Sequence, residues 1–398
     1  MAEPSRWSRR YVATGALALA AWAVLVVAET AGLLAVPRQT TVALVLFGFV
    51  FHVVFGKGYA LLPAYVDREL AVPLGPAVGY PLVAGGAAKL AVDGLVPLPE
   101  WAAAAGGIGW LLGVCVFVTA IGATVVPGVL AGETGTGAHN ADREPTDRLA
   151  TAFVPVVLAY LLVGSYVVAA RGWAVLPAPG GPPALGSHLL AAGAASLLVF
   201  AVGARLLPRF FVARLPRPLV AFVLVAGSVG PALLALGIVG RVPLAPGAAV
   251  QTVAVVGYAG LIALLFHRTD RDRVGFYGVL AGAGFALVGV ALGAWFAVDG
   301  VSAAGVDAHL RANLLGFLGL TIVGVSFQFY PPTVGVWPGS NDRTALGAIL
   351  ALAAGVGLSV LAPLAGLAAL QASAAAAIAL GVGSYCYLLG SAFRRATR

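Results

Sequence analysis

The chain has 398 residues, of which 61% are hydrophobic and only 10% are charged, against roughly 45–50% and 25% in an average soluble domain. This excess of apolar surface excludes a soluble globular fold and indicates that lipid is the solvent of much of the chain. The net charge of +8 does not indicate a nucleic-acid partner, because the basic residues are sorted by loop, as in membrane proteins.

Apolar runs long enough to cross a bilayer as helices, about 20 residues each, follow one another along the whole chain. They predict an all-α, polytopic membrane protein with about twelve transmembrane helices, which form a single membrane domain of residues 1–398. The expected helices span residues 11–36, 39–63, 75–97, 101–130, 149–170, 186–208, 217–240, 246–267, 274–298, 306–331, 344–366 and 369–392.

The arginines predict the orientation of these helices. If the N-terminus is inside, the inner segments hold seventeen arginines, and the outer ends hold only Arg38, Arg171, Arg241 and Arg311. Because cytoplasmic loops carry an excess of basic residues, the bias predicts a multi-pass protein of the cell membrane with both termini in the cytoplasm. The longest polar stretch, residues 131–148, is then a cytoplasmic loop between the fourth and fifth helices.

The second, sixth and tenth expected helices end in the same pattern. A glycine lies fifteen residues before a proline, with a small residue midway between them. The three sets are Gly48, Gly56 and Pro63; Gly193, Ala201 and Pro208; and Gly316, Gly324 and Pro331. Chance is the competing explanation in a chain with 53 glycines, but the period of four helices divides twelve into three. We therefore expect an internal repeat of roughly residues 1–130, 149–267 and 274–392, arranged as three four-helix arcs about a pseudo-threefold axis.

The tenth helix resembles a known pattern. Ala308-His309-Leu310, Leu314-Leu315-Gly316-Phe317, Leu320-Thr321-Ile322, Gly324 and Pro331 resemble the His-x-His-Leu…Leu-Gly…Thr-Ile-x-Gly…Tyr-His-x-x-Pro of subunit I of the haem–copper oxidases, in the cbb3-type and nitric-oxide-reductase-like branch. The match covers some 25 residues, and the rest of the chain agrees in helix count. The resemblance implies twelve helices around a haem.

The chain departs from this family at the dinuclear centre. Asp307 replaces the first histidine of the pattern, Phe327-Gln328 replaces Tyr-His, and residues 217–240 contain no histidine. We therefore expect a degenerate member that is not a complete terminal oxidase, and whether it is an enzyme stays open.

Haem iron bound between helices needs neutral imidazoles that face a common cavity. His309 is the main candidate ligand for a haem or metal ion, with Asp307 as a residue that orients it; the plain alternative is an interfacial, hydrogen-bonded histidine. His188 lies at similar depth, and His52 lies deeper; for both, a core histidine competes with a ligand. Arg311 is a candidate partner for a haem propionate or another anion.

Ionisable groups inside the bilayer are costly and often functional. They are Glu29, Lys57, Lys89 and Asp93, and the last two are spaced to form an ion pair on one helical face. One interpretation places Glu29, Lys89 and Asp93 with the two outer histidines in a pocket that opens outward.

The sequence therefore favours an integral membrane protein that binds at most one haem or metal and serves electron transfer, sensing or respiratory assembly. The alternative is a secondary transporter or permease in which Glu29, Lys57, Lys89 and Asp93 line a substrate or proton path. A third possibility is a scaffold that pairs with a membrane partner subunit or a second copy through glycine-rich faces.

Overall fold

The computed structural model describes residues 3–96, 98–173 and 175–395, and within these ranges it contains helices and loops but no strand. Eleven helices of the described chain are long and apolar enough to cross a membrane. A twelfth crossing, α4 (Gly75–Leu95), contains Pro81, Lys89 and Asp93 and is less apolar, but it packs along α5 (Glu100–Leu130). The prediction of an all-α, polytopic membrane protein is confirmed.

The helix ends agree with the expected ranges to within a few residues in most crossings. The first helix begins at Glu3 rather than at residue 11, and a helix begins at Glu144, inside the stretch expected to be a loop. The remaining elements are α1 (Glu3–Thr30), α2 (Arg38–Val42), η1 (Ala43–Val50), α3 (Phe51–Ala64), η2 (Ala138–Arg143), α6 (Glu144–Ala152), α7 (Val154–Gly172), α8 (Ala184–His188), η3 (Leu189–Ser196), α9 (Leu197–Phe211), α10 (Arg217–Ile238), α11 (Leu244–Arg268), α12 (Val274–Asp299), α13 (Ala303–Arg311), η4 (Ala312–Gly319), α14 (Leu320–Phe329), η5 (Pro332–Val334), α15 (Asp342–Ala365) and α16 (Ala369–Arg395).

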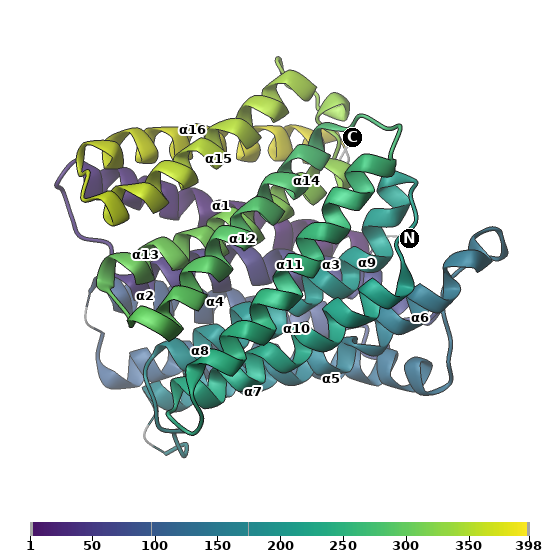
Figure 1. Cartoon of the computed structure of the whole chain (residues 1–398), viewed down its shortest axis with the longest axis horizontal. Coiled ribbons are helices and arrows are strands. Elements are labelled where there is room, and N and C mark those ends of the chain that lie inside the picture. Colours follow the sequence, from purple (N-terminus) through teal and green to yellow (C-terminus); the bar gives the residue numbers. More distant parts are fainter. Residues whose placement is uncertain (1–2, 97, 174, 396–398) are drawn as a thin grey trace.

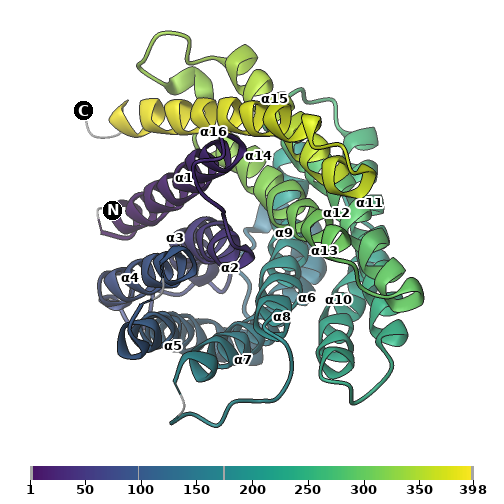
Figure 2. The same cartoon turned by 90° about the vertical axis from the view of Figure 1, so that its left-hand side faces the viewer.

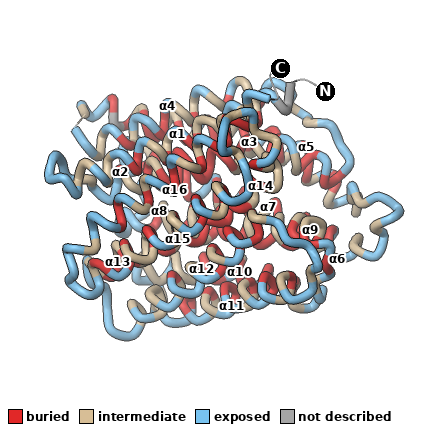
Figure 3. The backbone as a smooth tube through the Cα atoms, turned by 90° about the horizontal axis from the view of Figure 1, so that it is seen from above, coloured by how far each residue is buried: buried red, intermediate tan, exposed pale blue. Residues whose placement is uncertain are grey.

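The second, sixth and tenth crossings lie at the centre of the bundle, and the other crossings surround them (Figures 1 and 2). The share of an 18-residue apolar stretch that is buried inside the protein is 72%, 67% and 78% for these three crossings. It is between 28% and 50% for the other eight helices that qualify as spans. Figure 3 shows the buried residues gathered inside the bundle. Helix α16 packs along α1, so the first and last helices lie side by side. We call the end of the bundle where α1 begins and α16 ends the terminal face, and the other end the opposite face.

Each of the three central crossings contains an eight-residue π-helical segment, namely η1, η3 or η4. A π-helix widens the turn and is rare, and it occurs often at functional sites. The three segments lie at nearly the same distance from the proline that ends each signature: twelve residues in two crossings and thirteen in the third. The three central crossings therefore share a backbone irregularity as well as a sequence pattern.

The first glycine of each signature lets its helix approach the helix that precedes it in the chain. A methyl group at Gly48 would lie 2.7 Å from Cβ of Ala18 in α1, one at Gly193 would overlap the ring of Tyr160 in α7, and one at Gly316 would lie 2.5 Å from Cβ of Phe285 in α12. Lipid tails are as apolar as the helix surfaces, so no hydrophobic force drives membrane helices together. Close packing of this kind joins them instead.

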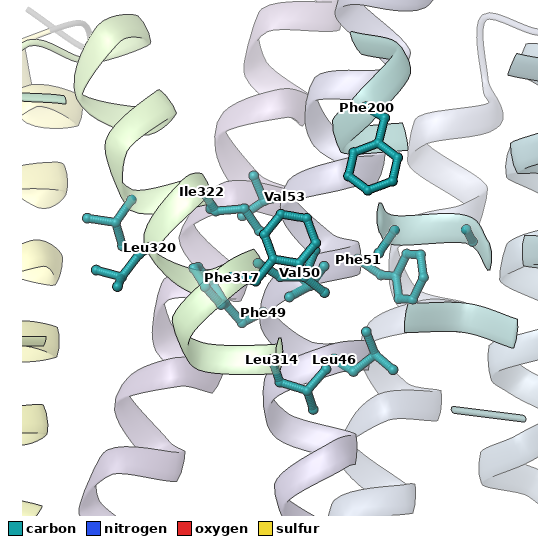
Figure 4. Close-up of a cluster of buried hydrophobic side chains, with 14 of the residues drawn as sticks. Leu46, Phe49, Val50, Phe51, Val53, Phe200, Leu314, Phe317, Leu320 and Ile322 are labelled. Carbon is teal, nitrogen blue, oxygen red and sulfur yellow. The ribbon is translucent and has the colours of Figure 1, made fainter. Parts of the chain in front are cut away.

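Packed apolar side chains fill the space between the three central crossings at mid-depth (Figure 4). The rings of Phe200 and Phe317, from the sixth and tenth crossings, lie with their centroids 6.2 Å apart. The side chains labelled in this cluster are Leu46, Phe49, Val50, Phe51, Val53, Phe200, Leu314, Phe317, Leu320 and Ile322.

Candidate functional site

His188 and His309 meet near the opposite face of the bundle. Their ring centroids are 6.0 Å apart and their planes differ by only 12°. His188 is the last residue of α8, so η3 begins directly after it, and η4 begins three residues after His309. The sequence places both histidines at similar depth, and the structure brings their rings together.

Backbone carbonyl groups orient both imidazoles. Nδ1 of His188 lies 3.1 Å from the carbonyl oxygen of Ala184, and Nδ1 of His309 lies 2.9 Å from that of Gly289 in α12. Because a carbonyl oxygen only accepts, Nδ1 carries the proton in the neutral ring and Nε2 keeps its lone pair. Metal-ligating histidines have this arrangement, with the second ring nitrogen held by a carbonyl or carboxylate group.

The separation of the two rings fits one shared metal centre. When two imidazoles bind one metal ion through nitrogens at about 2.0–2.1 Å, their ring centroids lie roughly 5 Å apart at a tetrahedral angle and roughly 6.5 Å apart on opposite sides of the metal. The observed 6.0 Å falls in that range. No group of three or more histidine, cysteine, aspartate or glutamate side chains that could bind a metal occurs in the described chain. Among the described residues, the two imidazoles therefore have no third histidine, cysteine, aspartate or glutamate side chain grouped with them.

Helix α12 forms the wall behind His309. A methyl group at Gly293 would lie 3.2 Å from Cε1 of His309, and the ring of Phe296 lies 5.5 Å from the imidazole, centroid to centroid. Asn313 donates from Nδ2 to the carbonyl oxygen of His309 at 2.8 Å. Nδ2 of Asn313 also lies 3.4 Å from Nδ1 of His309, so a neighbour on its own helix and the facing helix both contact the ring.

Two charged residues near His309 have other partners. Asp307, expected to orient His309, instead accepts a hydrogen bond from Nε of Arg38 at 2.5 Å. The physical reason is that Arg38, the first residue of α2, also donates to the carbonyl oxygen of Ala303 and so reaches across to α13. Arg311 donates to the carbonyl oxygen of Ser359 in α15 at 2.9 Å.

His52 lies apart from this pair. Its Nδ1 lies 2.8 Å from the carbonyl oxygen of Phe47, and its buried Nε2 has no hydrogen-bond partner among the described residues. Its ring faces Tyr11 of α1, at 6.0 Å between centroids. Since side chains fill the centre at mid-depth (Figure 4), a flat, rigid haem between the second and tenth crossings does not fit at that level.

The intramembrane acids and lysines do not gather around the histidines. Glu29 accepts from the backbone nitrogen of Val36 at 2.7 Å, and Asp93 accepts from Nε2 of Gln39 at 3.0 Å. Lys89 is exposed, and the ion pair with Asp93 that the spacing allows is not among the ion pairs of the described residues. Both carboxylates instead fix the chain around the start of α2.

Charged groups that the sequence indicated only as loop residues form contacts at the terminal face. Arg68 donates to both oxygens of Glu133, at 2.5 and 2.8 Å. These hydrogen bonds lower the pKa of Glu133 and raise the pKa of Arg68. Burial raises the pKa of the hydroxyl of Tyr65, which precedes Arg68 at the end of the second crossing, to about 12.

The sequence matches no known protein family, and no curated protein is found to be similar to it. The fold and the composition define the class: an integral membrane protein built from a bundle of helices, three of them central.

Proposed function

We propose that this integral membrane protein binds one haem or transition-metal ion through His188 and His309 and serves electron transfer or redox sensing. One observation carries the proposal: the two imidazoles lie parallel with centroids 6.0 Å apart, and both have Nδ1 on a backbone carbonyl oxygen. Each of the two neighbouring rings then keeps a lone pair on Nε2, and imidazole nitrogen suits iron, copper and zinc.

We also propose that the chain is a degenerate member of the haem–copper oxidase superfamily. The central position of the second, sixth and tenth crossings supports an internal repeat with units of roughly 1–130, 149–267 and 274–392. Further support comes from the π segment in each central crossing and from the glycine that packs on the preceding helix. His309 and the residues that follow it supply the family-like pattern.

The residue in place of the family's tyrosine favours electron transfer or sensing over reduction of oxygen or nitric oxide. Phe327, at the position of the family's tyrosine, is buried, and its ring packs against that of Tyr385 at 5.9 Å between centroids. A core aromatic contact therefore stands where the family pattern has a polar residue. In this role, His188 and His309 hold one haem or metal ion with two neutral imidazoles of fixed orientation.

A transport path is the weaker candidate. It would have to connect Glu29, Lys57, Lys89 and Asp93, but Glu29 and Asp93 fix the chain near the opposite face. Lys57 instead donates to Tyr330, near the terminal face. The packed cluster in Figure 4 lies between these two ends of the bundle.

The test is the metal and haem content of the purified full-length protein after expression in a host replete in haem and copper. We expect about one equivalent of haem or metal, with an absorption band if the centre is haem. We expect His188→Ala and His309→Ala each to lose it.

Matched controls separate ligation from folding. His52→Ala removes a buried histidine away from the pair, and His139→Ala removes an exposed one; both variants should keep the centre. Two neutral imidazoles that merely pack together would have the same ring separation. If the wild-type protein contains no haem or metal, or if His188→Ala and His309→Ala both keep the full amount, the two histidines only pack together.

A further inference from the structure

A cavity of about 690 Å³ opens at the terminal face, between the start of α1, the second half of α3, the end of α14 and the end of α16. It lies at the other end of the bundle from His188 and His309, so its chemistry is independent of the proposed metal centre. The lining residues that carry the inference are three cations, Arg9, Lys57 and Arg395, and two hydroxyl residues, Ser8 and Tyr330.

Lys57 is held at this cavity by neutral groups. Its ammonium group donates to the Tyr330 hydroxyl at 2.8 Å and lies over the rings of Phe329 and Tyr330, at 4.0 and 4.2 Å from their centroids. None of the ion pairs in the described part of the chain includes Lys57. The ammonium group has three N–H donors, and a single hydroxyl group accepts one of them.

The charge balance of the cavity points to an anionic ligand. The described residues that line it include Arg9 and Arg395 besides Lys57, and no aspartate or glutamate. A partly buried cation in a membrane protein is costly unless an anion or good acceptors compensate it. Arg395 donates to the carbonyl oxygen of Val334 at 3.3 Å, which holds its side chain near the end of the tenth crossing.

The remaining walls are apolar. Leu61 comes from α3, Phe329 from the end of α14, and Ala392 and Phe393 from α16. A small inorganic anion would use the cations and leave these walls uncovered. An anion with an apolar portion uses both, because cationic side chains bind phosphate oxygens and apolar surface gains from burial.

We infer that this cavity binds the phosphate group of an anionic amphiphile, with Lys57 as the central contact and Arg9 and Arg395 beside it. A membrane phospholipid and a soluble organic phosphate share this chemistry, and the apolar walls favour the lipid. Bound there, the ligand joins residues of the first, second, tenth and twelfth crossings, and so links both ends of the chain to the central helices.

Native mass spectrometry of the full-length protein in an uncharged detergent tests the inference, with phosphatidylglycerol and phosphatidylcholine offered in equal amounts. We expect preferential retention of phosphatidylglycerol by the wild type. Lys57→Gln should weaken that binding about tenfold, the usual effect of losing one charge-assisted hydrogen bond. Arg395→Gln should weaken it too, and it changes an exposed side chain, so folding is preserved.

The matched control is Arg271→Gln, which removes the same charge from an exposed loop residue outside the cavity, between α11 and α12. It should retain phosphatidylglycerol as the wild type does. Competition by glycerol 3-phosphate at equal concentration would identify a soluble phosphate as the source, and no competition would identify the lipid. Equal retention of the two lipids by the wild type, or equal phosphatidylglycerol binding in all three variants, would overturn the inference.

Discussion

Arg209 binds the carboxylate of Asp147 through two guanidinium nitrogens, Nη1 to Oδ1 at 3.0 Å and Nη2 to Oδ2 at 2.5 Å. Only 2% of the Asp147 side chain is exposed, and Nε of the equally buried Arg205 lies 3.9 Å from Oδ1. Arg205 also donates to the carbonyl oxygen of Tyr65 at 2.9 Å, and Thr136 donates to Asp147. The buried carboxylate of Asp147 thus links the loop and helix before the fifth crossing to the sixth crossing. Through Arg205, the sixth crossing also contacts the end of the second.

Removing this carboxylate should destabilise the protein strongly. Asp147→Asn leaves the buried Arg205 guanidinium without a counter-charge, and breaking a buried pair from one side costs about 3–5 kcal/mol. We expect a loss of that size in the free energy of unfolding, measured by denaturant titration in detergent.

The control for this variant is Glu144→Gln, in the same helix. Glu144 pairs with Arg148 at 2.8 Å, but both side chains are at least 40% exposed. Loss of an exposed pair should change stability by no more than about 0.5 kcal/mol. Equal effects of the two substitutions would show that Asp147 has no special structural role.

This cluster shows where sequence reasoning stops. The arginines and Asp147 could be placed at the correct ends of their helices, because the length of apolar runs follows from the thickness of the bilayer. The expected range 217–240, for example, agrees with α10 (Arg217–Ile238). Which loop acid reaches which helical arginine depends on how the helices pack, and no local pattern carries that information.

The histidine pair was predictable in part. The sequence placed His188 and His309 at similar depth and left open that they face each other. The bond of His188 to Ala184 follows from helix geometry, since residues four apart share a face. The contact of His309 with Gly289 comes from a different helix. The π segments η3 and η4 also rotate the chain beyond each histidine in a way that an α-helical register does not anticipate.

The close approach of α12 and α14 predicts a clear difference between two glycines of one helix. A methyl group at Gly275 would overlap the backbone carbonyl group of Gly324, whereas one at Gly284 would meet nothing within 4 Å. We expect Gly275→Ala to cost about 1–3 kcal/mol through forced separation of the helices. Gly284→Ala should be nearly neutral. Thermal unfolding of the two variants side by side checks this, and equal melting temperatures would contradict the packing described here.

The pair formed by Arg68 and Glu133 predicts a pH dependence. Arg68 lowers the pKa of Glu133, so in the folded protein the carboxylate holds its charge to lower pH than in the unfolded chain. The pair therefore contributes stability above the unfolded pKa of Glu133, and this contribution is lost as the pH falls through the lowered folded value. The stability difference between wild type and Glu133→Gln should be constant near neutral pH and vanish in acid. Arg68→Gln should return the pKa of Glu133 towards its ordinary value in an NMR titration, and an unchanged pKa would rule out the pairing.

The distribution of arginines predicts that the terminal face lies in the cytoplasm, with seventeen arginines expected on that side and four on the other. A background without Cys115 and Cys386 allows single cysteines to report the orientation. Ala178→Cys lies in the exposed loop between α7 and α8, and His139→Cys lies in the exposed η2 segment, at the other end of the bundle. A membrane-impermeant maleimide added to intact cells should label Ala178→Cys, and it should label His139→Cys only after permeabilisation, because loops rich in arginine stay inside. The reverse labelling would show the opposite orientation, in which His188 and His309 lie towards the cytoplasm and the cationic cavity faces outward.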